Sequence, residues 1–390
     1  MERLLLKAFN DAEMFLISAY IHVEDGDYWA FPHFKGKFRA TECGGTSSGL
    51  SALGMLNIYT SNNEKAMEFN NALQWLIGKQ RSNGSWQAAG IYSSEVTARI
   101  ICDLACIDHS FMTEIERACD FLMSCYSNDG YFNSIVNPHA IPHLYTTYIC
   151  VSALSRKGRL QNQNKQQIRE WIEKSGSNDG LWGLVPNHSY GTISHTIFAL
   201  EVLKICGVSN KELKKKYKKQ IRWLKKQMKD FKVIYDLEEI REEKGSDEYG
   251  KCYHTSSTQH NVSALLGSFF LDLGYLRYAT YITKIIIHSQ CAGGWGPSRD
   301  KLTMWACQQN IEFLVRYMNI YNKQTKIQKL YFRFMGLKIG KILWGIAFIL
   351  FGVACGWIIA DNSRLEEAIL SLILSFISAI LGHFSNDILN

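Results

Sequence analysis

Residues 75–86 read WLIGKQRSNGSW, and the fold of the chain depends on the pattern in this stretch. Two related stretches follow, FLMSCYSNDGYF at 121–132 and WIEKSGSNDGLW at 171–182, and a shorter one, IIIHSQCAGGWG, occupies 285–296. Each joins an aromatic or aliphatic helix end to a polar stretch, which leads to a glycine and an aromatic residue. Self-similarity at a fixed period predicts a repeat architecture.

One aromatic residue in each copy marks the length of the repeat. These landmarks are Trp29, Trp86, Phe132, Trp182 and Trp295, and they are separated by 57, 46, 50 and 113 residues. The last interval is close to two periods, so we expect one copy to be absent or remodelled near residues 234–254. Counting a first block at DGDYW (25–29) gives roughly six units of about 50 residues, each long enough for two helices.

A small or hydroxylated residue opens an apolar stretch after each landmark. These residues are Ser47, Thr97, Thr147, Thr196 and Thr258. A hydroxyl can cap the first turn of a helix, so we expect the second helix of each unit to begin at one of them. Few residues suggest strands. Six helical hairpins predict an all-α fold, a closed (α/α)6 toroid rather than an open solenoid.

The first copy also carries a family signature. Gln80, Gly84 and Trp86 match the QxxxGxW motif of squalene cyclases, and Trp75 stands where that motif has its aromatic lead. Residues 20–320 thus resemble the α/α toroid of terpenoid cyclases and protein prenyltransferase β subunits. We interpret the Gln, Gly and aromatic residues of the copies as builders of the barrel that carry no chemistry.

The resemblance implies one catalytic candidate, Glu95. Class II terpenoid cyclases protonate an alkene with the middle acid of an Asp-x-Asp-Asp-Thr-Ala motif, and residues 93–98 here read SSEVTA. Ser93 and Val96 replace the flanking aspartates, which orient and tune the acid in that family. Burial in an apolar lumen would raise the pKa of this carboxyl and keep it available as an acid. The alternative is an ordinary polar residue at a helix start.

Basic residues are the candidates for substrate binding. Arg299 and Lys301 lie in a stretch that resembles the diphosphate-binding segment of protein prenyltransferases, with a solvated loop as the alternative. His254 lies in a tripeptide resembling that family's zinc-ligand segment, but the Asp-x-Cys partner is missing. We therefore predict no metal and expect His254 to line the lumen. His195 is expected near the mouth of the toroid, as is His188. No phosphate or dinucleotide motif occurs, so no cofactor is predicted.

The formal charge of +7 is concentrated in two segments. Residues 211–232 carry +9 and residues 323–341 carry +6, so the remainder of the chain is acidic. This distribution argues against a general nucleic-acid binder. Apolar residues in 211–232 recur at helical spacing, which predicts an outer barrel helix with solvated lysines that could also lie on anionic lipid. The acidic residues after it predict an exposed loop or insertion. Eleven cysteines without a C-x-x-C pair indicate a reducing, cytoplasmic compartment.

The C-terminal part predicts a membrane anchor. Residues 342–360 and 368–384 are uncharged and apolar, and a helix of the first length reaches about 28 Å, close to the bilayer core. We therefore predict a toroid at 1–322, a basic juxtamembrane linker at 323–341 and a transmembrane hairpin at 342–390. The alternative for the two apolar runs is a pair of buried core helices.

The charges around the hairpin predict its orientation. Six basic residues precede the first span and Arg364 alone lies in the loop, so the toroid and both termini should face the cytoplasm at the plasma or inner membrane. Gly352 and Gly356 form a GxxxG motif, which can bring two copies of the chain together as a homo-oligomer.

Two hypotheses for the function follow. The first is a membrane-anchored cyclase or prenyltransferase relative that binds an isoprenoid or other apolar lipid in its lumen. The second is a non-enzymatic sensor or effector, in which the toroid binds a ligand or protein and the hairpin oligomerises or perturbs the bilayer. Glu95, Arg299 and Lys301 favour the first hypothesis, and the GxxxG motif and incomplete catalytic motifs favour the second.

Overall fold

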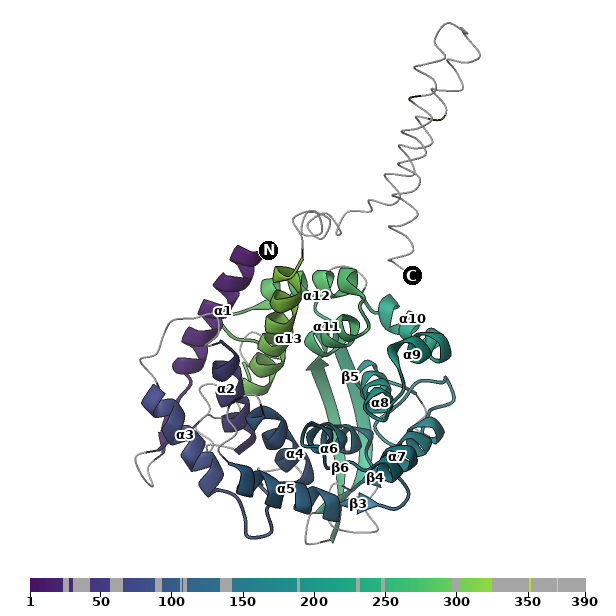
Figure 1. The fold of residues 1–390 in the computed structure, drawn as a ribbon, viewed down its shortest axis with the longest axis horizontal. Coiled ribbons are helices and arrows are strands. Elements are labelled where there is room, and N and C mark those ends of the chain that lie inside the picture. Colours follow the sequence, from purple (N-terminus) through teal and green to yellow (C-terminus); the bar gives the residue numbers. More distant parts are fainter. Residues whose placement is uncertain are drawn as a thin grey trace, which may run out of the picture. The chain divides into compact units, whose positions relative to one another are not determined.

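Helices alternate between an outer and an inner ring in the computed structural model (Figure 1). It describes residues 1–23, 28–30, 43–56, 66–87, 93–105, 107, 111–133, 142–187, 190–228, 232–246, 250–296, 302–324, 351 and 370. Two compact units divide the chain, one of residues 1–269 and 282–318 and one of 270–281 and 319–390. The contacts that define the ring below join residues of the first unit.

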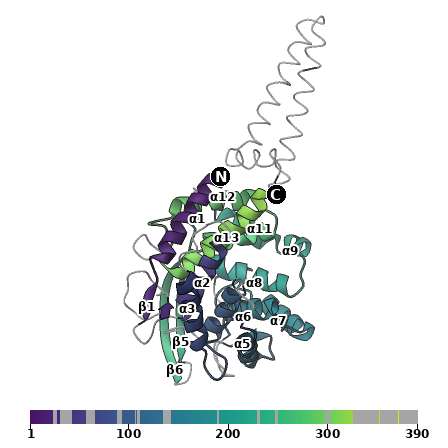
Figure 2. The same cartoon turned by 60° about the vertical axis from the view of Figure 1, so that its left-hand side comes forward.

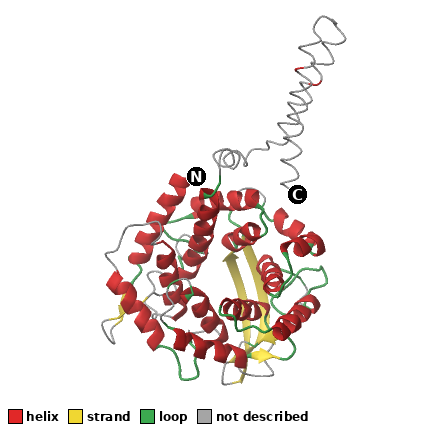
Figure 3. Ribbon diagram, in the orientation of Figure 1, coloured by secondary structure: helices red, strands yellow, loops and turns green. Residues whose placement is uncertain are grey.

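Each outer helix leads into an inner helix that follows it in the sequence. The outer helices are α1 (Glu2–Ile17), α3 (Ala66–Gly78), α5 (Met112–Ser124), α7 (Asn162–Lys174), the pair α9 (Asn210–Lys216) and α10 (Lys218–Lys226), and α12 (Leu276–Ser289). The inner helices are α2 (Cys43–Leu56), α4 (Ser93–Leu104), α6 (Leu144–Arg156), α8 (Ile193–Ile205), α11 (Ser263–Asp272) and α13 (Met304–Asn322). The alternation confirms the predicted α/α toroid (Figure 3).

The landmark aromatic residues tie the two rings together. The indole of Trp86 donates to the Leu76 carbonyl at 2.8 Å, and its backbone N–H donates to Thr97 Oγ1 at 2.9 Å. Trp182 makes the same pair of bonds, and the backbone N–H of Phe132 donates to Thr147 Oγ1 at 3.1 Å. Trp86 and Trp182 thus join the end of an outer helix to the next inner helix, and Phe132 binds the next inner helix.

These bonds correct the predicted helix starts. Thr97 and Thr196 lie inside their helices, where their hydroxyls accept from landmark backbones instead of capping the first turn. The N-cap of α8 is Thr192, whose hydroxyl accepts from the His195 backbone at 3.2 Å. The sequence pattern located these hydroxyls close to the landmarks, but each binds the backbone of the landmark in its own unit instead of capping a helix.

The glycine of each turn packs against the next outer helix. A Cβ atom on Gly84 would lie 2.3 Å from the Arg117 carbonyl of α5, and one on Gly293 would lie 2.3 Å from the Asp11 carbonyl of α1. Both glycines have positive φ, 85° and 84°, which a side chain disfavours. Gln290 Nε2 also donates to the Ala8 carbonyl at 2.9 Å. The last turn therefore packs on the first helix, which closes the ring.

The fifth turn is remodelled into a β-ribbon. β5 (Tyr235–Ser246) pairs antiparallel with β6 (Gly250–Asn261), and Figures 1 and 2 place this ribbon across one face of the ring. The sequence predicted a remodelled copy in this part of the chain, as an exposed loop or insertion, but it did not predict these strands. Thr258 lies in β6, and α11 begins later, at Ser263. Residues 252–258, CYHTSST, are rich in Thr, Ser and Tyr, which suit a strand better than a helix.

Two short strand pairs complete the described elements. β1 (Ile21–Val23) pairs with β2 (Tyr28–Ala30), and β3 (Tyr126–Ser127) pairs with β4 (Tyr131–Phe132) at the second copy of the repeat. Both pairs are antiparallel.

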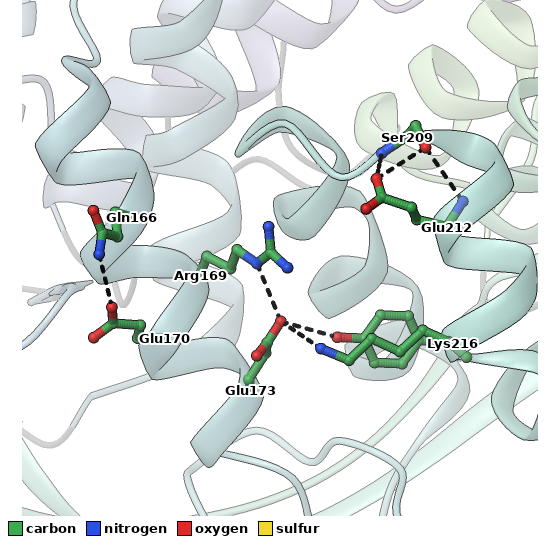
Figure 4. A network of polar contacts seen from close by, with 8 residues as sticks. Gln166, Arg169, Glu170, Glu173, Ser209, Glu212 and Lys216 are labelled. Carbon is green, nitrogen blue, oxygen red and sulfur yellow. Dashed lines mark hydrogen bonds and ion pairs between the residues drawn. The ribbon is translucent and has the colours of Figure 1, made fainter.

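The basic segment forms two outer helices rather than one. Leu213, Tyr217, Ile221 and Leu224 are buried, and α9 gives way to α10 at Tyr217. Figure 4 shows how α7 and α9 meet: Glu173 Oε1 accepts from Lys216 at 2.9 Å and from Arg169 at 3.2 Å. A capping box between Ser209 and Glu212 begins α9. The predicted inward packing of the apolar face is therefore confirmed.

The described part of the chain contains no helix long and apolar enough to cross a membrane. The predicted spans at 342–360 and 368–384 lie outside the described residues, apart from Phe351 and Leu370. Gly352 and Gly356 also lie outside them.

Candidate functional site

Three ionisable residues lie at intervals of four along the inner helix α4. They are Glu95, Arg99 and Asp103. Side chains four residues apart share one face of a helix, so the three form a row along α4. Their contacts reach α2, α6 and α13, which are also inner helices. The row therefore faces the space that the inner helices enclose.

Glu95 stands at the first-turn end of this row. It is half-buried, and Thr146 of α6 donates from Oγ1 to its Oε1 at 2.5 Å. Ser93 and Val96, which occupy the places of the family's flanking aspartates, are both buried. The structure thus places a single carboxyl at the motif position, bonded to a neighbouring inner helix. Its role as the catalytic acid stays a prediction.

Arg99, one turn further along α4, joins side chains of several inner helices. Its guanidinium donates to the Tyr145 hydroxyl of α6 and lies 5.3 Å from the centre of the Trp305 ring of α13. In the ring order, α2 separates α4 from α13, so the Arg99 side chain reaches past a neighbour through the interior. Burial raises the pKa of the Tyr145 hydroxyl, and the nearby Arg99 charge opposes that rise.

Aromatic rings continue this arrangement toward α8. Phe198 stacks on Tyr148 with ring centres 4.4 Å apart, and it meets Tyr145 at 5.4 Å. His195 meets the same phenylalanine edge-on at 5.6 Å. With Trp305, these rings give the interior an aromatic wall.

Asp103 is the most deeply placed carboxyl of the row. Only 4% of the residue is exposed, and its Oδ2 accepts from Ser47 Oγ at 2.8 Å and from Ser48 Oγ at 3.4 Å, both on α2. Burial raises its pKa to about 6, although the Arg99 charge and the Ser47 hydrogen bond oppose the rise. Burial thus favours the protonated form of this carboxyl.

A charged pair bridges the interior beyond Asp103. Arg156 of α6 lies 3.9 Å from Glu312 of α13, and Gln308 donates to Glu312 at 3.0 Å. Arg156 also donates to the Cys102 carbonyl of α4 at 3.1 Å. The expectation of one carboxyl in an apolar lumen is thus wrong, because the interior also holds further charges on three inner helices.

The structure does not gather all of the predicted substrate-binding residues. His195 is buried, and its Nδ1 lies 2.8 Å from Thr192 Oγ1, the cap of its own helix. For His254 the described part is its backbone in β6, opposite Glu242. Arg299 and Lys301 lie outside the described residues, as does His188. Their binding roles stay predictions.

Sequence reasoning missed Arg99, Asp103 and the aromatic wall. The four-residue spacing of Glu95, Arg99 and Asp103 was a signal that was available once residues 93–104 were expected to be helical. The contact with Trp305 had no such signal, because it joins positions far apart in the chain. Among the described residues, no cluster of three or more His, Cys, Asp or Glu side chains could hold a metal ion.

The chain also matches a known protein family. The model of the prenyltransferase alpha-alpha toroid domain matches residues 11–174 and 141–244, which together span more than half of the chain. The chain belongs to the prenyltransferase α/α-toroid family. Membership accounts for the alternating rings and for the turns that bind neighbouring hairpins.

Solved structures share this fold at low sequence identity. A type II terpene cyclase, MstE from Scytonema, determined with geranylgeranyl dihydroxybenzoate, is 12% identical, with a TM-score of 0.51 over 82% of this chain and 98% of that chain. An α-1,6-mannanase from Salegentibacter, determined with α-1,6-mannotriose, is 7% identical, with a TM-score of 0.54 over 81% of this chain and 99% of that chain. No curated protein matches this sequence. These likenesses support the fold alone.

Proposed function

We propose that the toroid binds an isoprenoid or another apolar lipid between its inner helices. The observation that carries this proposal is the aromatic wall beside Glu95 at the motif position. Tyr145, Phe198 and Trp305 bring aromatic rings from three inner helices to the interior, and the half-buried Glu95 carboxyl lies one turn of α4 from Arg99, which contacts two of these residues. Burial of hydrocarbon against such rings is the main source of affinity for an apolar ligand. Family membership and the ligand named for MstE add support.

We further propose that the chain is anchored in a membrane by the hairpin at 342–390, with the toroid and both termini in the cytoplasm. Support comes from the length and apolarity of the two segments and from the basic residues before them. A membrane anchor suits a ligand that partitions into lipid. Fusion of a reporter after Asn390 that is active only outside the cytoplasm should give no signal, and strong activity would refute this orientation.

Ligand extraction tests the binding proposal directly. Lipids extracted from the purified full-length protein should contain an apolar compound enriched over the membrane background, as identified by mass spectrometry. Replacing Trp305 by Ala should reduce its amount, because the substitution removes part of the wall. Trp171→Ala is the matched control, since this tryptophan is equally half-buried but lies on the outer helix α7. Equal recovery from both variants would contradict the proposal.

The catalytic part of the proposal concerns Glu95. Glu95→Gln keeps the size of the side chain and its hydrogen bond to Thr146 but removes the transferable proton. If the protein cyclises its ligand, turnover should fall by about 10²–10⁴-fold, the usual contribution of a general acid, while ligand binding persists. Full turnover in the Gln variant would exclude acid catalysis by this residue.

A non-enzymatic sensor or effector is the second candidate. It is supported by the replacement of both flanking acids with Ser93 and Val96, and by the Arg156–Glu312 pair that bridges the interior. In that case Glu95→Gln should be silent in a cellular assay, whereas Leu at Gly352 and Gly356 should abolish the effect by separating the anchor helices. The opposite pattern would favour the enzyme.

A further inference from the structure

The β-ribbon gives the outer helix α12 a different neighbour from the one that the outer helix α7 has. At the second turn, Tyr131 follows Gly130 and packs on Trp171 of α7, with ring centres 5.6 Å apart. Trp171 is the first residue of the third copy, and Ile285 of α12 is the first residue of the fourth. In the unit before α12, the connection from the outer helix α10 to the inner helix α11 is the β5–β6 ribbon instead of a glycine turn. A different environment is therefore expected around Ile285.

A pocket lies at this place. Its volume is about 820 Å³, within the range of small-molecule sites, and it is lined from the C-terminal half of α12, the start of β5 and the end of β6. Lys284 and His288 line it from α12, one turn apart, and Tyr235 and Asn261 line it from paired positions of the two strands. Ile285 and Trp295 contribute apolar surface. The pocket thus combines a basic edge with apolar walls.

The two basic side chains suit an anion. Lys284 supplies a point charge, the form in which lysine commonly binds phosphate. The Nδ1 atom of His288 lies 2.7 Å from the Lys284 carbonyl, which can only accept, so Nδ1 carries the hydrogen. The second ring nitrogen, Nε2, then becomes a donor when the imidazole is protonated. An anionic group at this edge would receive charge-assisted hydrogen bonds from both residues.

We propose that this pocket binds a phosphorylated amphiphile, with the phosphate at Lys284 and His288 and the apolar chain against Val233 and Leu302, two half-buried residues of its lining. The site lies outside the row on α4 and does not depend on the ligand proposed for the interior. The ribbon that stands in place of the fifth glycine turn supplies part of its lining. The ribbon that interrupts the repeat therefore forms part of a second binding site.

Titration of the full-length protein in a neutral detergent tests the site. Dodecyl phosphate, inorganic phosphate and dodecyl maltoside serve as probes, and isothermal titration calorimetry measures their affinities. Dodecyl phosphate should bind saturably and more tightly than inorganic phosphate, because its chain buries apolar surface. The double variant Lys284→Gln, His288→Gln should weaken dodecyl phosphate by about tenfold or more, the effect of losing charge-assisted bonds.

Two controls make the outcome decisive. Lys165→Gln removes a half-buried lysine of the outer helix α7, away from the pocket, and should leave the affinity unchanged. The circular dichroism of each variant should match that of the unsubstituted protein, since the replaced side chains are partly or fully exposed. A charge-reversing variant, Lys284→Glu, should abolish phosphate binding altogether.

Three results would overturn the proposal. They are unchanged binding of dodecyl phosphate in the double variant, equal binding of dodecyl maltoside, and inorganic phosphate binding as tightly as dodecyl phosphate. The second result would remove the role of the anionic head, and the third would remove the role of the chain. Loss of lipid from the Trp305→Ala variant bears on the interior site instead, so failure of one proposal is separable from failure of the other.

Discussion

The turns at the rim and the side chains of the interior follow different rules. At the rim, the contacts repeat: Gly84 packs on α5 as Gly293 packs on α1, and Gln80 bonds across units as Gln290 does. In the interior, the row of Glu95, Arg99 and Asp103 occurs on α4 alone among the inner helices described. Repeated contacts build the ring, and side chains that break the repeat are the candidates for function.

The largest expected effect is at the turn that closes the ring. Gly293→Ala puts a Cβ atom 2.3 Å from the Asp11 carbonyl at a positive φ of 84°, so backbone must move. We expect a loss of about 3 kcal/mol or more in the free energy of unfolding, measured by urea denaturation in detergent. Gly158→Ala is the control, with φ of 68° and open space around it, and should cost about 1 kcal/mol. Equal losses would remove the special role of the closing turn.

Interior and rim carboxyls should respond to pH in opposite directions. Burial raises the pKa of Asp103 from 3.8 to about 6, so the folded state holds this proton more tightly than the unfolded state. The stability from this group is therefore full at low pH and is lost as pH rises through about 6. Asp103→Asn should gain stability above pH 6, at most on the order of 3 kcal/mol, and nothing near pH 3.

Asp179 provides the matching rim carboxyl. Burial works to raise its pKa, but hydrogen bonds from Ser177 and from the backbone of Leu181 and Gly191 hold it below its ordinary value. Its stabilising contribution is present at neutral pH and is lost as pH falls through the lowered pKa. Asp179→Asn should therefore lose stability at pH 7 and differ little in acid. Urea denaturation between pH 3 and pH 7 measures the free energy of unfolding of both variants. A change of the same sign in both variants at pH 7 would contradict the difference between rim and interior carboxyls.

A smaller effect is expected at Gln290. Its side-chain amide donates to the Ala8 carbonyl and the Gly293 carbonyl, both at 2.9 Å, and Ala would leave these acceptors without that donor. We expect Gln290→Ala to lower the free energy of unfolding by about 1–2 kcal/mol. Gln220→Ala, which removes an exposed bond to the Gly180 carbonyl, should cost less. A larger loss at Gln220 would show that the closing bond is no stronger than its counterparts.

The smallest effect is expected on the outer surface. Lys216 pairs with Glu173 in the network of Figure 4, with about half of its side chain exposed. Exposed ion pairs contribute little, so Lys216→Ala should change the free energy of unfolding by less than about 1 kcal/mol. High salt should reduce the difference further, since it screens the pair. A loss comparable to that of Gly293→Ala would make this network a structural element of the ring.

The family, the alternation of outer and inner helices and the position of Glu95 near a helix start could all be predicted from the sequence. These features depend on spacing along the chain, because the Gln, Gly and aromatic pattern recurs and marks each turn. The same spacing placed Thr97 and Thr196 close to the landmarks, and only the structure showed that their hydroxyls bind landmark backbones rather than cap helices.

Two features became visible only in the folded chain: which side chains meet in the interior, and which elements line the pocket. Arg99 meets Trp305, and Arg156 meets Glu312, across more than 150 residues of chain, because the closed ring brings non-neighbouring inner helices to one space. The pocket beside Ile285 likewise combines residues of α12 with residues of both strands of the ribbon. Local spacing predicts which face of a helix a side chain occupies, but the opposite wall depends on how the ring closes.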